Sequence, residues 1–328
     1  MASHKKIEEN SVNIGLLTEI ARRYYIDKET QDSIGKTLNL PRMKINRLLK
    51  QAQDEGIVEI RVRFHSAETS ELENLFRKHF GLKNLLIAPD GQSQEQQRTN
   101  VAVVVSNFLE VNLRENSVVT VGMGRNVARV SKVNTNRKFD SLTFVAGSGG
   151  ATEATEGGNA DHIARNLAIQ FGGTSETLYA PAFVADAKLH KSLMENDTIR
   201  RTLNLARSAN FALIGIGDLG PDSHMARMGW FSHEEFKQAQ AQGVVGDLMG
   251  YDFFNRDGKT CNNELGERVI GLTINDLRQI KNTIAIASET SKITAIIGAL
   301  KTGAIDILAT TLSNCVAISE YLKNENPN

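Results

Sequence analysis

The first fifty residues carry apolar positions with the period of amphipathic helices. Apolar side chains recur there at i, i+3, i+4 and i+7, which places them on one face of a helix. In the first such segment they are Leu17, Ile20, Ala21 and Tyr24. The pattern predicts a helix over roughly residues 13–25, with this face turned toward a small core.

Two further helices follow, separated by a short break at residues 39–41. Thr30 suits the N-cap of the second helix, which buries Ile34 and Leu38. Pro41 suits the first position of the third helix, because the N–H that proline lacks needs no partner there. The third helix turns inward Ile45, Leu48, Leu49 and Ala52. The last two helices therefore form a helix-turn-helix unit with a supporting helix before it.

A change of period marks the end of this unit. Gly56 is expected to end the third helix, and "IVEIRVRF" after it alternates apolar and charged residues like a wing or a linking strand. Residues 68–80 read as a connecting helix that ends at Gly81. We therefore expect a winged-type helix-turn-helix domain over 1–62 and a second domain over 63–328.

From Asn84 onward, apolar strands alternate with helices, which is typical of a parallel sheet covered on both faces. The predicted strands are 84–88, 117–122, 141–146, 211–217, 283–287 and 305–309. The predicted helices are 94–114, 125–134, 159–171, 196–208, 290–301 and 312–322. The fold class is thus α/β, with a doubly wound, largely parallel second domain.

Charge changes the picture in the first domain. The chain has 38 basic and 38 acidic residues, yet residues 33–53 hold no acidic side chain. The basic residues of this stretch are Lys36, Arg42, Lys44, Arg47 and Lys50. Such a face is either a solvated helix surface or a nucleic-acid interface, and a small N-terminal helical unit favours the second interpretation.

The second helix of a helix-turn-helix pair lies in the major groove, with its N-terminal residues nearest the base edges. Arginine and lysine can bind guanine or phosphate there, and an asparagine such as Asn46 can pair with adenine. The residues predicted to contact double-stranded DNA are Thr30, Gln31, Arg42, Met43, Lys44, Asn46 and Arg47.

Several other protein classes are excluded by composition. The longest aliphatic run, residues 101–105, is far shorter than the roughly 20 residues that span a bilayer. The N-terminal residues lack the apolar segment of a secretory signal, and Cys261 and Cys315 show no metal-like spacing. We expect a cytoplasmic protein with reduced thiols and no cofactor.

Ligands of open α/β sheets bind beyond the carboxyl ends of the strands. The first such end, "SVVTVGMGRNVARVSKV", lets the backbone of residues 122–125 approach an anion at a helix N-terminus. As a dinucleotide fingerprint it is weak, because Val127 replaces the third glycine, and no Walker A motif is present. A small phosphorylated ligand fits better than NAD or ATP, and a plain tight turn is the alternative.

Other predicted strand ends are also polar or rich in glycine. They carry the glycine cluster 147–150, then Asp218, Asp222 and His224, then Asp247, and finally Lys292. Asn159 or Asp161 is expected to cap the helix after the glycine cluster. Each feature alone has a structural explanation, since carboxylates cap helices and single lysines are usually solvated. Their position at the ends of one sheet favours a binding site.

The segment "ETQDSIGKTLNLPRMKINRLLKQAQDEGIVEIRV" resembles the DNA-binding head of the SorC/DeoR-type bacterial transcriptional regulators. Gly35, Pro41 and Asn46 depart from the usual alanine and two usual serines. The glycine costs about 1 kcal/mol of helix propensity, whereas the asparagine concerns operator choice rather than the fold.

The order of features over residues 60–322 also resembles the effector domain of these regulators. The resemblance implies a fold like ribose-5-phosphate isomerase and glucosamine-6-phosphate deaminase, a phosphorylated sugar or polyol as ligand, and a homodimer or homotetramer. The implied effector-binding residues are Gly122, Met123, Gly124, Arg125, Ser148, Gly149, Gly150, Asp247 and Lys292.

Two of these positions depart from the family pattern. Ser148 stands where some deoxysugar-responsive members carry a lysine that forms an imine, so we expect non-covalent binding. Met123 stands where the family often has an aromatic residue, so the ligand itself stays open.

The competing hypothesis is a sugar-phosphate isomerase or deaminase. The segment "GIGDLGPDSHMA" resembles a deaminase loop, and Asp222 with His224 could supply an acid–base pair. Ser223 and Pro221 depart from that loop, and a DNA-binding head gives an enzyme no advantage. The sequence therefore favours a regulator of sugar or polyol catabolism genes that is not an enzyme, and leaves activation and repression open.

Overall fold

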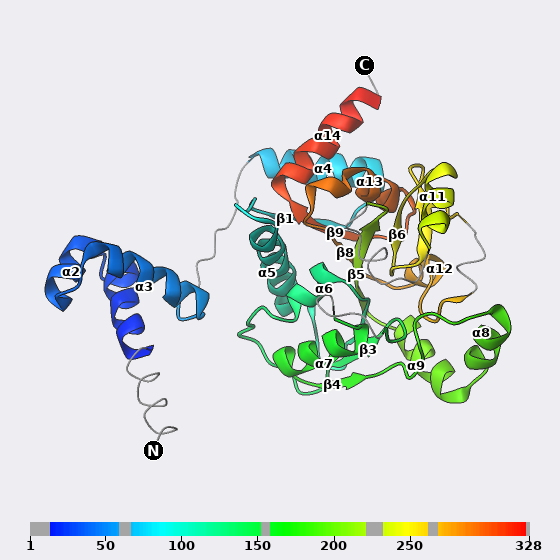
Figure 1. Cartoon of the computed structure of the whole chain (residues 1–328), viewed down its shortest axis with the longest axis horizontal. Coiled ribbons are helices and arrows are strands. Elements are labelled where there is room, and N and C mark those ends of the chain that lie inside the picture. Colours follow the sequence, from blue (N-terminus) through cyan, green and yellow to red (C-terminus); the bar gives the residue numbers. More distant parts are fainter. Residues whose placement is uncertain (1–13, 59–66, 152–157, 221–231, 262–267, 326–328) are drawn as a thin grey trace. The chain divides into compact units, whose positions relative to one another are not determined.

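The computed structural model describes residues 14–58, 67–151, 158–220, 232–261 and 268–325. The chain divides into two units, Met1–His65 and Ser66–Asn328. Figure 1 labels the elements of both. Among the helices in the described ranges, none is long and apolar enough to cross a membrane.

The first unit is helical. Residues 14–21 form a helix that continues into the π-helical turn η1 (Arg22–Ile26), and α2 (Gln31–Leu38) and α3 (Arg42–Asp54) follow. Its core consists of Leu17, Ile20, Ala21, Ile34, Ile45, Leu48, Leu49 and Ala52. These are positions that the helical period predicts to be inward, with Tyr24 and Leu38 partly buried beside them.

Local chemistry fixes the break between α2 and α3. The Thr30 hydroxyl accepts a hydrogen bond from Ser33 N at 3.1 Å, so the predicted N-cap is confirmed. Asn39 ends α2 in the left-handed region, at φ 52°. α3 begins one residue later than predicted. Pro41 has an extended ψ of 142° and is therefore the N-cap of α3 rather than its first helical residue.

Gly35 has a steric role that helix propensity does not indicate. A Cβ at this position would lie 2.6 Å from the Leu40 carbonyl oxygen. The Gly35 carbonyl in turn accepts a hydrogen bond from Leu40 N at 2.9 Å. A side chain here would therefore push the turn away from α2. At the other end of α3, Gly56 has φ 74°, as expected of a helix terminator, while most of the predicted wing lies outside the described residues.

The second unit contains a sheet with the strand order β1-β9-β8-β5-β2-β3-β4, in which all neighbours are parallel. The hairpin of β6 and β7 pairs antiparallel with β5, off this path. The strands are β1 (Asn84–Ala88), β2 (Val118–Val121), β3 (Thr143–Ala146), β4 (Thr174–Glu176), β5 (Phe211–Asp218), β6 (Val244–Leu248), β7 (Asp252–Asn255), β8 (Thr283–Ile286) and β9 (Ile307–Thr311).

Helices cover both faces of this sheet (Figure 1). On one face lie α5 (Gln94–Asn112), α6 (Arg125–Val130) and α7 (Ala160–Phe171). On the other lie α4 (Ala67–Phe80), α9 (Asp197–Arg207), α12 (Ile274–Leu277), α13 (Ile293–Lys301) and α14 (Leu312–Glu325). The predicted α/β class and the largely parallel sheet are confirmed, because each central strand is apolar on both sides and needs two covering layers.

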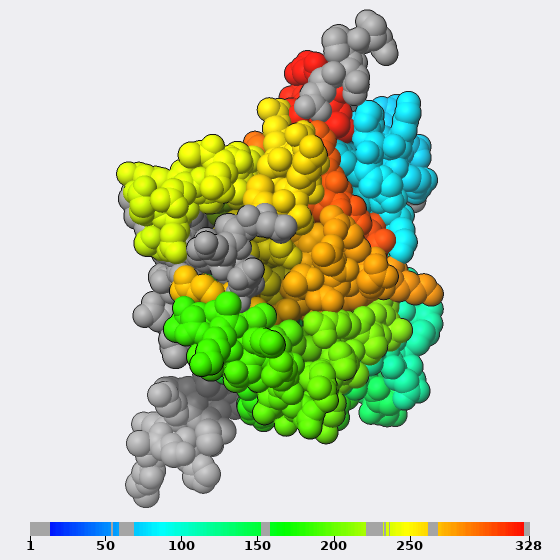
Figure 2. All heavy atoms as spheres, turned by 90° about the vertical axis from the view of Figure 1, so that its right-hand side faces the viewer, coloured from blue at the N-terminus to red at the C-terminus, as the bar shows by residue number. Residues whose placement is uncertain are grey.

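Two more helices complete the described part of the unit, α8 (Ala187–Met194) and α11 (His233–Ala241). Figure 2 shows the side on which α11 (yellow) and the α8–α9 pair (green) reach the surface above and below residues 268–282 (orange). The sequence patterns missed α8, α11, α12, β4, β6 and β7. Most of these lie outside the main parallel sheet, yet the β6–β7 hairpin contributes to the site described next.

Candidate functional site

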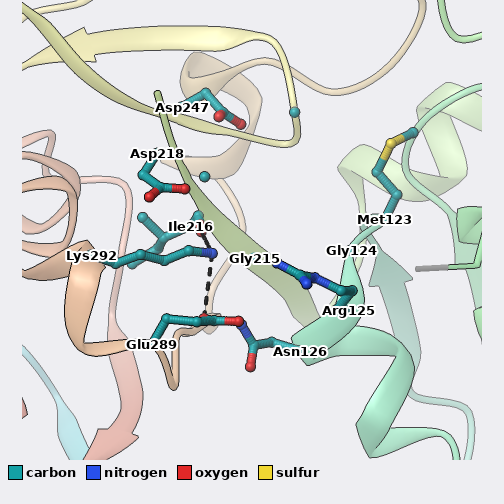
Figure 3. Close-up of a pocket in the computed structure, with 12 residues that line it drawn as sticks. Met123, Gly124, Arg125, Asn126, Gly215, Ile216, Asp218, Asp247, Glu289 and Lys292 are labelled. Carbon is teal, nitrogen blue, oxygen red and sulfur yellow. Dashed lines mark hydrogen bonds and ion pairs between the residues drawn. The ribbon is translucent and has the colours of Figure 1, made fainter. Parts of the chain in front are cut away.

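A pocket lies beyond the carboxyl ends of β2, β5 and β8, where α/β sheets usually bind ligands. It encloses about 520 Å³ of space not filled by protein atoms, including the part open to solvent. Its lining is Met123, Gly124, Arg125, Asn126, Gly215, Ile216, Gly217, Asp218, Asp247, Gly250, Glu289 and Lys292. Figure 3 shows Asp218 and Asp247 on one side of Lys292, Glu289 and Asn126 on the other, and Arg125 reaching in from α6.

Five of the nine predicted effector residues line this pocket, namely Met123, Gly124, Arg125, Asp247 and Lys292. Gly122 lies behind the lining, where its N–H donates to the Leu213 carbonyl at 2.8 Å. A Cβ there would lie 3.1 Å from Met249 Sδ. Gly122 therefore provides close packing between β2 and the β6–β7 turn.

The predicted facing turn, Ser148 to Gly150, lies outside the lining of this pocket. The Gly149 N–H donates to the Ile270 carbonyl and the Gly150 N–H to the Ala180 carbonyl, each at 2.9 Å. These two amides are thus already paired within the protein. The Ser148 hydroxyl is buried without a hydrogen-bond partner among the described residues.

Asp247 is held over the sheet by strand pairing. It faces Gly217 in the antiparallel register of β5 and β6, and a Cβ at Gly217 would collide with its carboxylate. Its Oδ2 atom is buried with no hydrogen-bond partner in the described structure. Burial raises the pKa of Asp247 to about 7, although Lys292 and the Gly250 N–H oppose the rise. Near neutral pH this carboxyl can therefore either accept or donate a hydrogen bond to a hydroxyl.

Lys292 ends the short 3₁₀ turn η3 (Thr290–Lys292) that follows β8. Its Nζ donates to the Ile216 carbonyl at 2.7 Å and lies 3.4 Å from Glu289 Oε2. The side chain is 12% exposed, so its charge is mostly removed from water. This ammonium reaches the pocket from the strand end on which the sequence predicted it.

Glu289 was not predicted, yet it contacts several charged and polar groups in and behind the pocket wall. Its carboxylate accepts from Asn126 Nδ2 at 2.8 Å and from Arg98 Nη2 at 3.2 Å. Burial alone would raise the pKa of Glu289, but Lys292, Asn126 and Arg98 together lower it to about 2. Glu289 is therefore ionised throughout the neutral range.

The sequence patterns did not predict Asn126, Glu289 or the supporting Arg98 as part of the site. Asp218 was named as a strand-end residue but not among the predicted effector-binding residues. Asp218 and Glu289 both stand at strand ends, so the same positional signal applied to them. Arg98 gave no such signal, because it lies in α5, a helix with several buried apolar residues. Asp222 and His224 lie outside the described residues. Among those described, no cluster of histidine, cysteine and acidic side chains suits a metal ion.

In the first unit, the predicted DNA-contacting residues of α3 are exposed: Arg42, Met43, Lys44, Asn46 and Arg47. Arg42 lies 3.9 Å from Asp32, with both side chains more than 60% exposed. Lys44 and Arg47 form no ion pair with another described residue. At the start of α2, Thr30 is exposed and Gln31 is half-buried. The unit thus presents a row of solvated cations and one amide.

Comparison with known proteins identifies the second unit. A family model described as "Putative sugar-binding domain" matches residues 65–318, which is most of the chain. The chain belongs to this sugar-binding domain family. A domain of a transcriptional repressor from Vibrio fischeri shares 45% identity and a TM-score of 0.72, covering 78% of this chain and all of that one.

Longer relatives extend the match to both units. The transcriptional regulator LsrR of Enterobacter sp. (strain 638) is 27% identical over 327 residues, or 96% of this chain and 98% of its own. The full-length sorbitol operon regulator SorC of Klebsiella pneumoniae shares the fold, with 24% identity, a TM-score of 0.70, and coverage of 93% and 98%. The resemblance to SorC/DeoR-type regulators is confirmed, and these relatives are regulators rather than enzymes.

Proposed function

We propose that this protein is a DNA-binding transcriptional regulator whose affinity for DNA is changed by a sugar or polyol bound in the second unit. The observation that carries the proposal is the pocket at the strand ends, where Arg125, Asp247 and Lys292 converge. The relatives of this chain support the role in transcription, since their names include a sorbitol operon regulator and other transcriptional regulators.

On the DNA side, the first unit acts as a winged-type helix-turn-helix domain with α3 in the major groove. The exposed Arg42, Lys44 and Arg47 bind phosphates or guanine edges, and Asn46 pairs with a base. Thr30 and Gln31, at the start of α2, approach the sugar–phosphate backbone of the DNA. The exposure of these side chains without buried partners supports this role.

On the ligand side, a phosphate lies at residues 123–125, held by Arg125 and by backbone N–H groups. The sugar or polyol hydroxyls bind the Asp247 carboxyl, and Lys292 donates to a ligand oxygen. Binding is non-covalent, since Ser148 offers no amine for an imine. The isomerase-like fold that the family resemblance implies belongs to the same proposal.

The protein functions as a homodimer or homotetramer, because paired recognition helices match the two half-sites of an operator. A ligand can shift the affinity for DNA only by its differential affinity for two arrangements of the protein. That coupling is typically about 1–3 kcal/mol, or about 5–150-fold in affinity.

Fluorescence anisotropy of labelled DNA from upstream of the protein's own gene tests this proposal. We expect salt-sensitive, sequence-selective binding that one compound in a panel of sugars, polyols and their phosphates shifts by about fivefold or more. Binding that ignores both DNA sequence and every compound would contradict it, and turnover of a sugar phosphate by the purified protein would favour the enzyme hypothesis.

A further inference from the structure

The pocket already contains an anion of its own. Glu289 Oε2 accepts from Asn126 Nδ2 at 2.8 Å and from Ser288 N at 3.3 Å, and it lies 3.4 Å from Lys292 Nζ. A carboxylate with a side-chain amide, a backbone N–H and an ammonium around it occupies the kind of seat that proteins build for anionic ligand groups. We name these four groups, Glu289, Asn126, Ser288 N and Lys292, the anion seat.

The seat is held in place from behind. Arg98 is buried, and its guanidinium donates to Glu289 Oε1 at 3.2 Å. The same guanidinium donates to Glu95 at 2.9 Å, and Glu95 in turn lies 3.0 Å from Arg129. Asn126 is oriented by the Ser288 hydroxyl, which donates to its Oδ1 at 2.7 Å. Glu289 is therefore a fixed part of the pocket wall.

The charges around the pocket do not favour a strongly anionic ligand. Its lining includes two cations, Arg125 and Lys292, against three carboxyl groups, Asp218, Asp247 and Glu289. The ammonium of Lys292 is already paired with Glu289 and with the Ile216 carbonyl. A dianion placed beside Lys292 would have to approach the Glu289 carboxylate as well, and like charges at a few ångströms in a partly dry site repel strongly.

We propose that Glu289 sets the charge selectivity of the pocket by acting as a built-in anion beside Lys292. With Glu289 as its anion, the anion seat binds hydroxyl groups of a ligand and repels a second anionic group. The ligand class that fits is a polyhydroxy compound with at most one phosphate, which lies at residues 123–125, and with otherwise uncharged groups. This inference rests on the proposed function, since it concerns the same pocket.

Binding of inorganic phosphate at about pH 8, where the ion is mostly dianionic, tests the role of Glu289. Isothermal titration calorimetry is run on the full-length wild-type protein, Glu289→Gln, and the double variant Glu289→Gln/Lys292→Ala. Neutralising the carboxylate should raise the affinity for phosphate by about tenfold or more, because one nearby negative charge is removed. The double variant should lose this gain, since the freed ammonium provides it.

Glu195→Gln is the matched control. It makes the same chemical change on an exposed carboxylate at the C-cap of α8, outside the lining of the pocket, and it should bind phosphate like the wild type. If Glu289→Gln folds poorly by thermal unfolding, Glu289→Ser removes the same charge and must show the same gain. Equal affinities in wild type and variant, no binding by either, or a gain that survives the loss of Lys292 would each overturn the proposal.

The test is independent of DNA binding. A gain of phosphate affinity that leaves DNA affinity untouched at all phosphate concentrations would support the role of Glu289 and count against the regulatory proposal. The two conclusions can therefore fail separately.

Discussion

The two units of this protein arrange charge in opposite ways. On α3 the cations are exposed, and Lys44 and Arg47 have no ionic partner among the described residues. In the pocket, the charged groups of Glu289, Lys292 and the supporting Arg98 are largely buried, and each contacts another. Exposed charges are available for a polyanion such as DNA, whereas buried charges must be paired before a ligand arrives. Substitutions should therefore affect binding in the first unit and both stability and binding in the second.

The largest effect is expected from breaking the buried pairs. Glu289→Ala removes the partner of Lys292 and one partner of Arg98, and should lower the free energy of unfolding by about 3 kcal/mol at neutral pH. The folded-state pKa of Glu289 is about 2, below its ordinary 4.5, so this stabilisation is present above pH 4.5 and is lost as pH falls through about 2. Urea unfolding of both proteins against pH measures it, and a constant small difference would contradict the pairing.

Asp247 should show the opposite pH dependence. Its folded-state pKa of about 7 lies above its ordinary 3.8, so the folded protein binds more protons than the unfolded chain between these values. Wild-type stability should therefore fall as pH rises from about 4 to about 7 and level off above it. Asp247→Asn should lack this loss, which we expect to be on the order of 2–4 kcal/mol. If the free energies of unfolding of the two proteins changed in parallel with pH, the burial of an ionisable Asp247 carboxyl would be contradicted.

The exposed cations should affect DNA and little else. Arg47→Ala or Arg42→Ala should weaken operator binding by about tenfold each and reduce its salt dependence, while the free energy of unfolding changes by less than about 0.5 kcal/mol. Lys188→Ala on α8 removes an exposed cation from the second unit and serves as the control. Unchanged affinity and salt slope for both arginine variants would contradict the placement of α3 in the groove.

The smallest effect concerns the turn that presents α3. Gly35→Ala should lower the free energy of unfolding by about 1 kcal/mol or more, because the new methyl group would meet the Leu40 carbonyl oxygen. Helix propensity alone predicts a gain of about 1 kcal/mol from the same change. Thermal unfolding thus gives opposite signs for the two explanations.

The sequence predicted most of the parallel sheet because buried strands appear as short apolar runs and amphipathic helices show apolar residues at a helical period. It missed the β6–β7 hairpin, since the turn there is the three residues Met249, Gly250 and Tyr251, with φ of 61° and 89° at the first two, instead of the usual two-residue Asn-Gly or Asp-Gly turn. The hairpin carries Asp247, which was predicted from its glycine neighbours and the family resemblance rather than from a strand.

The candidate site was predictable only in part. Lys292 and Arg125 follow strand ends in the chain, so their position in the pocket follows from the topology. The pairing of Glu289 with Arg98 joins residues 191 positions apart, and no local pattern contains it. For the same reason, the sequence did not show that the amides of Gly149 and Gly150 are bonded to Ile270 and Ala180.

The most direct test of the central claim compares the ligand response of wild-type protein and Lys292→Ala on operator DNA. Anisotropy is measured while the compound identified in the panel is titrated into each protein–DNA complex. We expect equal DNA affinity without ligand, and a shift of about fivefold or more with ligand in the wild type only. A normal response in Lys292→Ala would contradict the assignment of this pocket as the effector site.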